Sequence, residues 1–131
     1  MVDTPQRDPN QFLRLAERHL ERVRKAVEGP DFSDLGTYGL YCLEALVNAA
    51  ALKSGKRLLK SHWDKAKEAR LLQRKHGFPD VSRLMSDLND LRKAEAYGDD
   101  EDLDTSDFDA EEICEKIEEY YNSVKEFLAV K

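Results

Sequence analysis

The chain has 131 residues, of which 40% are hydrophobic and 37% charged, with six glycines, four prolines and a net charge of −6. This length suits one domain with a single core, and the composition favours a compact helical protein over a sheet protein or a disordered chain. The negative charge argues against uniform, non-specific binding of nucleic acid, but it is compatible with a local basic face.

The apolar periodicity first predicts two helices in the N-terminal half. Asp8-Pro9 suits an N-cap followed by proline at the first helical position, and Gly29-Pro30 stops that helix. A second helix is expected at about 35–54, capped by Ser33 or Asp34. Because its apolar residues lie almost all round, we expect the other helices to surround it.

Three more helices are predicted in the C-terminal half. Ser61 begins the third, with Asp64 completing a capping box, and it runs to residue 75. Asp80 caps the fourth helix, and Gly98 suits the position just after its C-terminus. The last helix begins near Asp109. The chain is therefore predicted to be all-α. We expect an up-and-down bundle of four to five helices in one domain, 1–131, with its core at about 9–130 and an acidic loop at 99–109.

The two cysteines and the N-terminal sequence indicate in which cellular compartment we expect the protein. Cys42 and Cys114 lie in apolar helical patterns, and neither belongs to a CxxC or Cys/His cluster. This predicts two buried thiols in a reducing environment. No signal peptide opens the chain, and Glu44 and Asn48 interrupt the most apolar run, so we expect a cytoplasmic protein without a membrane span.

Two segments have a strong charge bias. Residues 53–75 contain nine Lys or Arg and two acids, and residues 99–109 contain seven acids and no base. Either can be a solvated surface. The functional alternative for the first is a phosphate-facing basic strip formed by Arg57, Lys60, Lys67, Arg70 and Arg74. The acidic segment lacks the spacing of a calcium loop, and no motif indicates a metal or another cofactor.

No catalytic motif is present: the chain has no Gly-rich phosphate loop, no nucleophile elbow and no HExxH. Of the three histidines, His19 lies among charged residues and is expected to face solvent, and His76 suits the carbonyl end of the third helix. His62 follows the start of that helix, next to Trp63. We expect either a structural role or a proton-transfer role for it.

Polar residues interrupt two apolar stripes. On the second helix, Thr37, Tyr41, Glu44 and Asn48 share one stripe, so the carboxylate must be paired, hydrogen-bonded or at an interface. On the fourth helix, Arg92 continues the apolar stripe. It either snorkels past the core edge or pairs with Glu95, or it lines a polar cleft with Glu44, Asn48 and Tyr97.

Three segments carry a family resemblance. They are the Tyr- and Ala-rich residues 38–46, Lys-Ser-His at 60–62, and Leu-Arg-Lys-Ala-Glu-Ala-Tyr-Gly-Asp at 91–99, followed by the acidic loop and a helix with paired tyrosines. From about Phe12 to Leu128 the chain resembles the HEPN superfamily (higher eukaryotes and prokaryotes nucleotide-binding), which are small bundles of four to five helices. It resembles in particular the short, free-standing prokaryotic members.

The resemblance implies a conditional function. Many HEPN proteins are metal-independent ribonucleases that act as homodimers, with an Arg-x(4–6)-His motif facing across the dimer axis. Arg92 matches the arginine, but positions 97, 98 and 99 are Tyr, Gly and Asp, so the general acid/base is missing. Other members bind nucleotides or RNA without cutting, or pair with a nucleotidyltransferase encoded nearby that in some cases modifies a tyrosine. Tyr97 is a candidate acceptor, although its spacing differs from the Arg-x4-His-x-Tyr form.

We therefore expect a homodimeric HEPN-like protein that binds RNA, a nucleotide, or a nucleotidyltransferase partner as in toxin–antitoxin-type systems, without ribonuclease activity. Arg92 and Tyr97 would contact phosphate, Glu44 and Asn48 would orient the arginine, and His62 is the further candidate for proton transfer. Two alternatives stay open. One is a non-catalytic homodimeric interaction module whose polar stripe is a dimer seam, and the other is an active metal-independent ribonuclease with a substitute acid.

Overall fold

The computed structural model describes residues 8–97 and 108–130, with the backbone alone for 94–97. Within these ranges the chain forms helices and no strand, which confirms the predicted all-α bundle. The helices are α1 (Pro9–Glu28), α2 (Phe32–Lys53), α3 (His62–His76), α4 (Ser82–Tyr97) and α5 (Ala110–Ala129). Gly98 and the greater part of the acidic loop lie outside the described residues.

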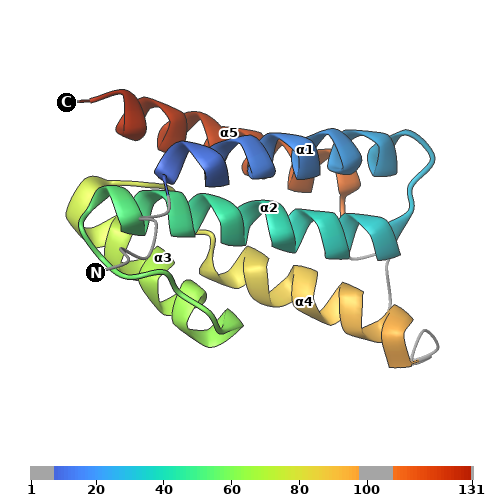
Figure 1. The fold of residues 1–131 in the computed structure, drawn as a ribbon. Helices are drawn as coiled ribbons and strands as arrows, with labels where there is room; N and C mark the ends of the chain where they lie inside the picture. The colour runs from blue at the N-terminus through green and yellow to red at the C-terminus, as the bar shows by residue number, and fades with distance from the viewer. Residues whose placement is uncertain (1–7, 98–107, 131) are drawn as a thin grey trace, which may run out of the picture.

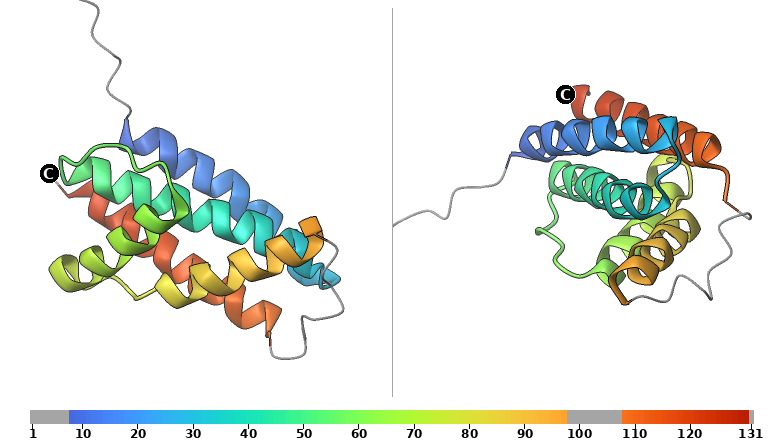
Figure 2. Two further views of the ribbon diagram at one scale, coloured as in Figure 1. Left: turned by 90° about the horizontal axis from the view of Figure 1, so that it is seen from below. Right: turned by 90° about the vertical axis from the view of Figure 1, so that its right-hand side faces the viewer.

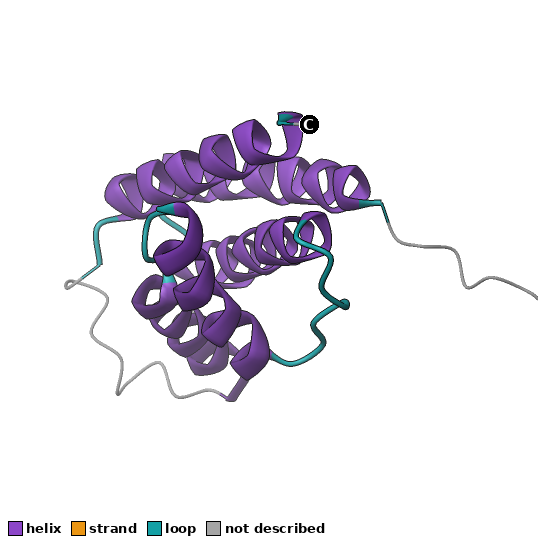
Figure 3. Cartoon of the chain, turned by 90° about the vertical axis from the view of Figure 1, so that its left-hand side faces the viewer, coloured by secondary structure: helices purple, strands orange, loops and turns teal. Residues whose placement is uncertain are grey.

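Helix α2 lies at the centre of the bundle. Helices α1 and α5 lie on one side of it, and α3 and α4 lie on the other (Figures 1 and 2). The end-on view shows α2 between these two layers (Figure 3). Helix α2 contacts all four other helices, as its all-round apolar pattern predicted.

The core consists of one face of each outer helix packed around α2. Leu20 and Val23 of α1, Leu88 of α4, and Ile117 and Val124 of α5 are almost completely buried. Helix α2 is long and apolar enough to cross a membrane, yet most of its residues are buried inside the bundle, as in the core helix of a soluble protein.

Short polar side chains cap the N-termini of several helices. Ser61 caps α3 by accepting a hydrogen bond from the backbone N–H of Asp64, as predicted. The predicted cap of α2 is wrong. Helix α2 starts at Phe32, and Asp31 accepts from the backbone N–H of Asp34. The helix begins three residues early because Asp31 directly follows the Gly29-Pro30 stop and has a side chain suited to the cap.

Two glycines of α2 lie against α4. A Cβ atom at Gly36 would lie 2.7 Å from Cβ of Leu91 and 2.8 Å from the backbone nitrogen of Arg92. At Gly39 the nearest atoms would be 3.2 Å away, at the tips of Ile117 and Leu88. The glycines therefore set the spacing of the two helices and place Arg92 opposite the first turns of α2.

Candidate functional site

A buried carboxylate joins α2 to the start of α3. Glu44 is 5% exposed. One of its oxygens pairs with Nδ1 of His62, and the other lies 3.7 Å from Nζ of Lys65. The prediction that a carboxylate on this apolar helix must be paired is confirmed, and its partners come from α3.

Asn48 lies one turn further along α2 and holds the segment that leads into α3. Its Oδ1 accepts a hydrogen bond of 2.9 Å from the backbone N–H of Leu59. Because Asn48 is also 5% exposed, this bond satisfies a buried polar group. The two polar residues of α2 thus fix the entry into α3, two residues before its Ser61 cap.

The His62 side chain is half exposed, with a side-chain exposure of 51%. Next to it is a hollow of about 260 Å³, which we call the α3–α4 pocket. Its lining comprises Leu40, His62, Trp63, Ala66, Arg70, Ser82, Met85, Ser86 and Asn89. The pocket combines an imidazole, an exposed indole and a guanidinium with the amide and hydroxyls of α4.

Arg92 is connected to the edge of this pocket but not to Glu44. Its Nη2 donates a hydrogen bond of 2.7 Å to Oδ1 of Asn89, and its Nε is buried without a partner among the described residues. The prediction that Glu44 and Asn48 orient Arg92 is wrong. Arg92 lies opposite Gly36, and eight residues of α2, about 12 Å, separate Gly36 from Glu44.

Two residues grouped with Arg92 cannot be placed in the same way. The side chains of Tyr97 and Glu95 lie outside the described residues, so the predicted phosphate contact of Tyr97 and the pairing of Arg92 with Glu95 stay predictions.

A second hollow, of about 350 Å³, opens on the other side of His62, between α1, α2 and α3. His19 borders it and is partly buried, with its ring 5.7 Å from that of Tyr41 and 6.1 Å from that of Tyr38. His19 is therefore only partly exposed, whereas the sequence predicted that it faces solvent. Burial, followed by the guanidiniums of Arg18 and Arg22, lowers the pKa of His19.

One face of α3 is basic. Lys67, Arg70 and Arg74 are exposed and follow Trp63 at positions i+4, i+7 and i+11, which places all four on one stripe. Trp63 is 71% exposed. We call these four residues the α3 basic face. Arg57 and Lys60, the other members of the predicted basic strip, are exposed in the segment before α3.

Little negative charge offsets this face within α3. Of its two acids, Glu68 is buried and both of its oxygens bond to Nζ of Lys56, at 2.8 and 2.7 Å. Asp64 lies in the first turn. Just before α4, Asp80 accepts hydrogen bonds from the backbone N–H and the hydroxyl of Ser82, which lower the pKa of its carboxyl, and the guanidinium of Arg70 adds to this shift.

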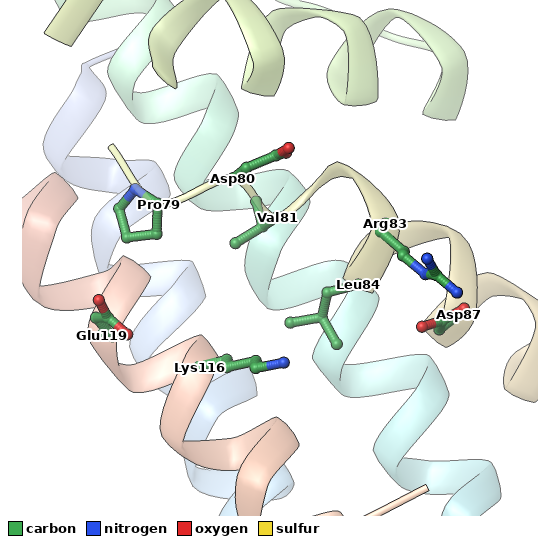
Figure 4. Close-up of a pocket in the computed structure, with 8 residues that line it drawn as sticks. All are labelled: Pro79, Asp80, Val81, Arg83, Leu84, Asp87, Lys116 and Glu119. Carbon is green, nitrogen blue, oxygen red and sulfur yellow. The ribbon is translucent and has the colours of Figure 1, made fainter. Parts of the chain in front are cut away.

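A further hollow, of about 400 Å³, lies between the start of α4 and α5 (Figure 4). Its charged lining has both signs: Asp80, Arg83 and Asp87 come from the start of α4 and the segment before it, and Lys116 and Glu119 come from α5. It therefore has no net attraction for a polyanion, unlike the α3 basic face.

Sequence reasoning overlooked three parts of this arrangement. The spacing of Trp63 from Lys67, Arg70 and Arg74 was available as a helical stripe and could have been found. The contact of Asn89 with Arg92 also follows an i, i+3 spacing on α4. The pairing of Glu44 with His62 has no local signal, because it joins residues 18 positions apart on two helices.

Comparison with known families supports the resemblance seen in the sequence. A family model described as the HEPN domain matches residues 10–127, which is most of the chain. No curated protein and no solved structure shows a significant match. The match includes nearly all of the five helices, and the chain belongs to the HEPN domain family.

Proposed function

We propose that the protein binds RNA, with the α3 basic face as its contact surface. The observation that carries this proposal is the position of Trp63, which is 71% exposed at the head of a row of three exposed cations. An indole of this size is usually at least partly buried in a core. A single-stranded base can stack on it while Lys67, Arg70 and Arg74 contact the phosphates.

The charge distribution supports this surface in spite of the net charge of −6. Lys56 neutralises the buried Glu68, so the exposed charge along α3 is mainly positive. Arg57 and Lys60 extend the positive charge into the segment that precedes the helix. Non-specific affinity for a polyanion depends on such a local strip, because phosphate contacts act over about a Debye length.

The α3–α4 pocket gives this surface a place for one nucleotide. It opens beside Trp63 and Arg70 and offers the side chains of Ser82, Ser86 and Asn89 as hydrogen-bonding groups. Aromatic stacking next to a few fixed polar groups is a common way to hold an unpaired base or ribose.

Membership of the HEPN family agrees with contact to RNA or nucleotides, but the family motif is incomplete here. Arg92 has no histidine four to six residues further on, and its Nη2 bonds to Asn89. We therefore propose binding at α3 and not cleavage through that motif. The homodimer and a nucleotidyltransferase partner stay predictions from the resemblance.

The proposal is tested by fluorescence anisotropy with a labelled single-stranded RNA of mixed sequence at low salt. Trp63→Ala should weaken binding roughly 5- to 150-fold, since loss of stacking on one aromatic side chain costs about 1–3 kcal/mol. Arg70→Glu should also weaken binding, because it reverses a charge on the α3 basic face.

Arg14→Glu is the matched control, since Arg14 is an exposed arginine on α1, in the layer on the far side of α2 (Figure 1). It carries the same change in net charge and should leave the affinity near that of the wild type. Equal loss in Arg14→Glu and Arg70→Glu would show only a response to net charge. Absence of RNA binding by the wild type would favour the non-catalytic interaction module.

A further inference from the structure

We propose that the hollow of about 350 Å³ between α1, α2 and α3 binds an uncharged aromatic amide, with Glu44 and Asn48 as its polar floor. Such a ligand carries an N–H and a C=O side by side on a ring or next to one, as in a carboxamide or a lactam. We call this hollow, which Tyr41, Glu44, Ala45 and Asn48 line from α2, the α1–α2 hollow. It goes beyond the proposed function, because it faces α1, whereas the α3–α4 pocket faces α4.

Asn48 supplies a free hydrogen-bond donor. Its Oδ1 accepts from the backbone N–H of Leu59, which identifies the other end of the side chain as the NH₂ group. Nδ2 donates no hydrogen bond in the described part of the chain, although Asn48 is only 5% exposed. The enclosed, unpaired side-chain atoms of the described residues are Nε of Arg92 and the hydroxyl of Tyr120. Nδ2 is not one of them, so it reaches the hollow that Asn48 lines.

Glu44 supplies a free acceptor one helical turn before Asn48. Its Oε2 pairs with Nδ1 of His62. Its Oε1 lies 3.7 Å from Nζ of Lys65, which is longer than a hydrogen bond, and accepts none from the described residues. Because residues four apart are neighbours on a helix face, the floor of the hollow presents an acceptor beside a donor. A ligand that pairs with both recovers hydrogen bonds that these buried groups otherwise lack.

An amide is the functional group that complements this floor. Its N–H would donate to Oε1 of Glu44, and its C=O would accept from Nδ2 of Asn48. A carboxylate has no N–H and would face the charge of Glu44, whereas an ammonium group has no acceptor for Asn48.

The walls of the hollow favour a flat, apolar ring beside the amide. Tyr41 is 39% exposed, and its ring lies 5.7 Å from that of His19 at an angle of 57°. Phe12 and Leu15, both partly buried, line the hollow from α1. A planar ligand can therefore stack on an aromatic face while its edge contacts aliphatic carbon.

The charges around the hollow favour an uncharged ligand. Burial, followed by the guanidiniums of Arg18 and Arg22, lowers the pKa of His19, so its ring is neutral at neutral pH. The permanently charged side chains of the lining, Glu44 and Lys65, oppose each other. The lining therefore lacks the excess of positive charge that a phosphate group needs, in contrast to the α3 basic face.

Benzamide is the probe that tests this site, titrated into the full chain labelled with ¹⁵N. A ligand of this size should bind with a dissociation constant on the order of 1 mM. The side-chain NH₂ signals of Asn48 should shift during the titration, and their absence from the spectrum of Asn48→Asp identifies them. Benzoate and N,N-dimethylbenzamide, which have the ring but no N–H, should bind about 10-fold more weakly.

Two pairs of variants separate the ligand contacts from folding. Asn48→Asp keeps an oxygen for the N–H of Leu59 but loses the donor, and it should weaken benzamide binding roughly 10-fold. Asn89→Asp makes the same change in the α3–α4 pocket and should leave the affinity unchanged. Tyr41→Ala should weaken binding about 2- to 12-fold, and Tyr41→Phe, which keeps the ring, should not.

Several outcomes would overturn the inference. They are the absence of a shift at Asn48, equal affinity for benzamide and N,N-dimethylbenzamide, and loss of binding in Asn89→Asp alone, which would place the ligand in the α3–α4 pocket. Single-stranded RNA that displaces benzamide and shifts the Asn48 signals would make the hollow part of the RNA surface. Benzamide binding by a protein that binds no RNA would support the α1–α2 hollow and remove the proposed function alone, so the two failures are distinguishable.

Discussion

Gly36→Ala tests how tightly α2 and α4 are packed. The added Cβ would lie 2.7 Å from Cβ of Leu91, 2.8 Å from the backbone nitrogen of Arg92 and 2.9 Å from the carbonyl oxygen of Leu88. Ordinary carbon contacts are about 3.5–4.0 Å, so α4 would have to move away by roughly 1 Å. Two of the three atoms are backbone, so a side-chain rotation cannot relieve the contact.

The expected net effect is a loss of about 2 kcal/mol in the free energy of unfolding. Overpacking that must move backbone costs about 3 kcal/mol, and replacing glycine with alanine inside a helix returns about 1 kcal/mol. For a domain of this size the midpoint of thermal unfolding should fall by roughly 6–10 °C, measured by circular dichroism at 222 nm.

Gly39→Ala and Gly29→Ala provide matched controls. At Gly39 the nearest atoms, at 3.2 Å, are the tips of Leu88 and Ile117, and at Gly29 no atom lies within 4 Å. Both variants should unfold close to the wild type, because side-chain tips can rotate and open space imposes no contact. If Gly36→Ala unfolds at the same temperature as Gly39→Ala or at a higher one, the result would contradict the close contact of α2 with α4 at Gly36.

Three further outcomes are expected. RNA affinity should fall about 20-fold between 50 and 200 mM salt, because three phosphate contacts by the α3 basic face give a slope of about −2 in log K against log salt, and a flat titration would contradict those contacts. Burial raises the pKa of the Cys42 thiol to about 12 and that of Cys114 to about 11, so both should resist a thiol reagent at pH 8 until the protein is unfolded. Tyr120→Phe should leave stability unchanged or raise it by up to about 1 kcal/mol in urea unfolding, because its buried hydroxyl has no partner among the described residues. Tyr121→Phe, which removes a hydroxyl bonded to Glu17, should not be stabilising.

The fold could be predicted from the sequence because its signals are local. Asp8, Ser61 and Asp109 cap α1, α3 and α5 at or next to the predicted starts, and α2 is central as its all-round apolar pattern indicated. The start of α2 differed because Ser33, Asp34 and Asp31 are all suitable caps, and choosing among them requires the geometry of the preceding turn.

The candidate site was harder to predict from the sequence, because it depends on how the helices are placed relative to one another. The sequence predicted that Glu44 needs a partner, but it could not show whether α3 or α4 would supply it. The family motif predicted that Arg92 belongs to the site. The contact of α4 with α2 at Gly36, however, places Arg92 about 12 Å along α2 from Glu44. His62 is the partner of Glu44 because the segment before α3, which Asn48 holds by a hydrogen bond, places the start of α3 beside the middle of α2.

The most direct test of the account is the intrinsic fluorescence of the protein during titration with single-stranded RNA. Trp63 is the only tryptophan in the chain, so the signal comes from the proposed stacking residue alone. Stacking of a base should quench this fluorescence and protect it from acrylamide, with the same dissociation constant as anisotropy of the labelled RNA. RNA that binds by anisotropy without changing the tryptophan signal would contradict the α3 basic face as the binding surface.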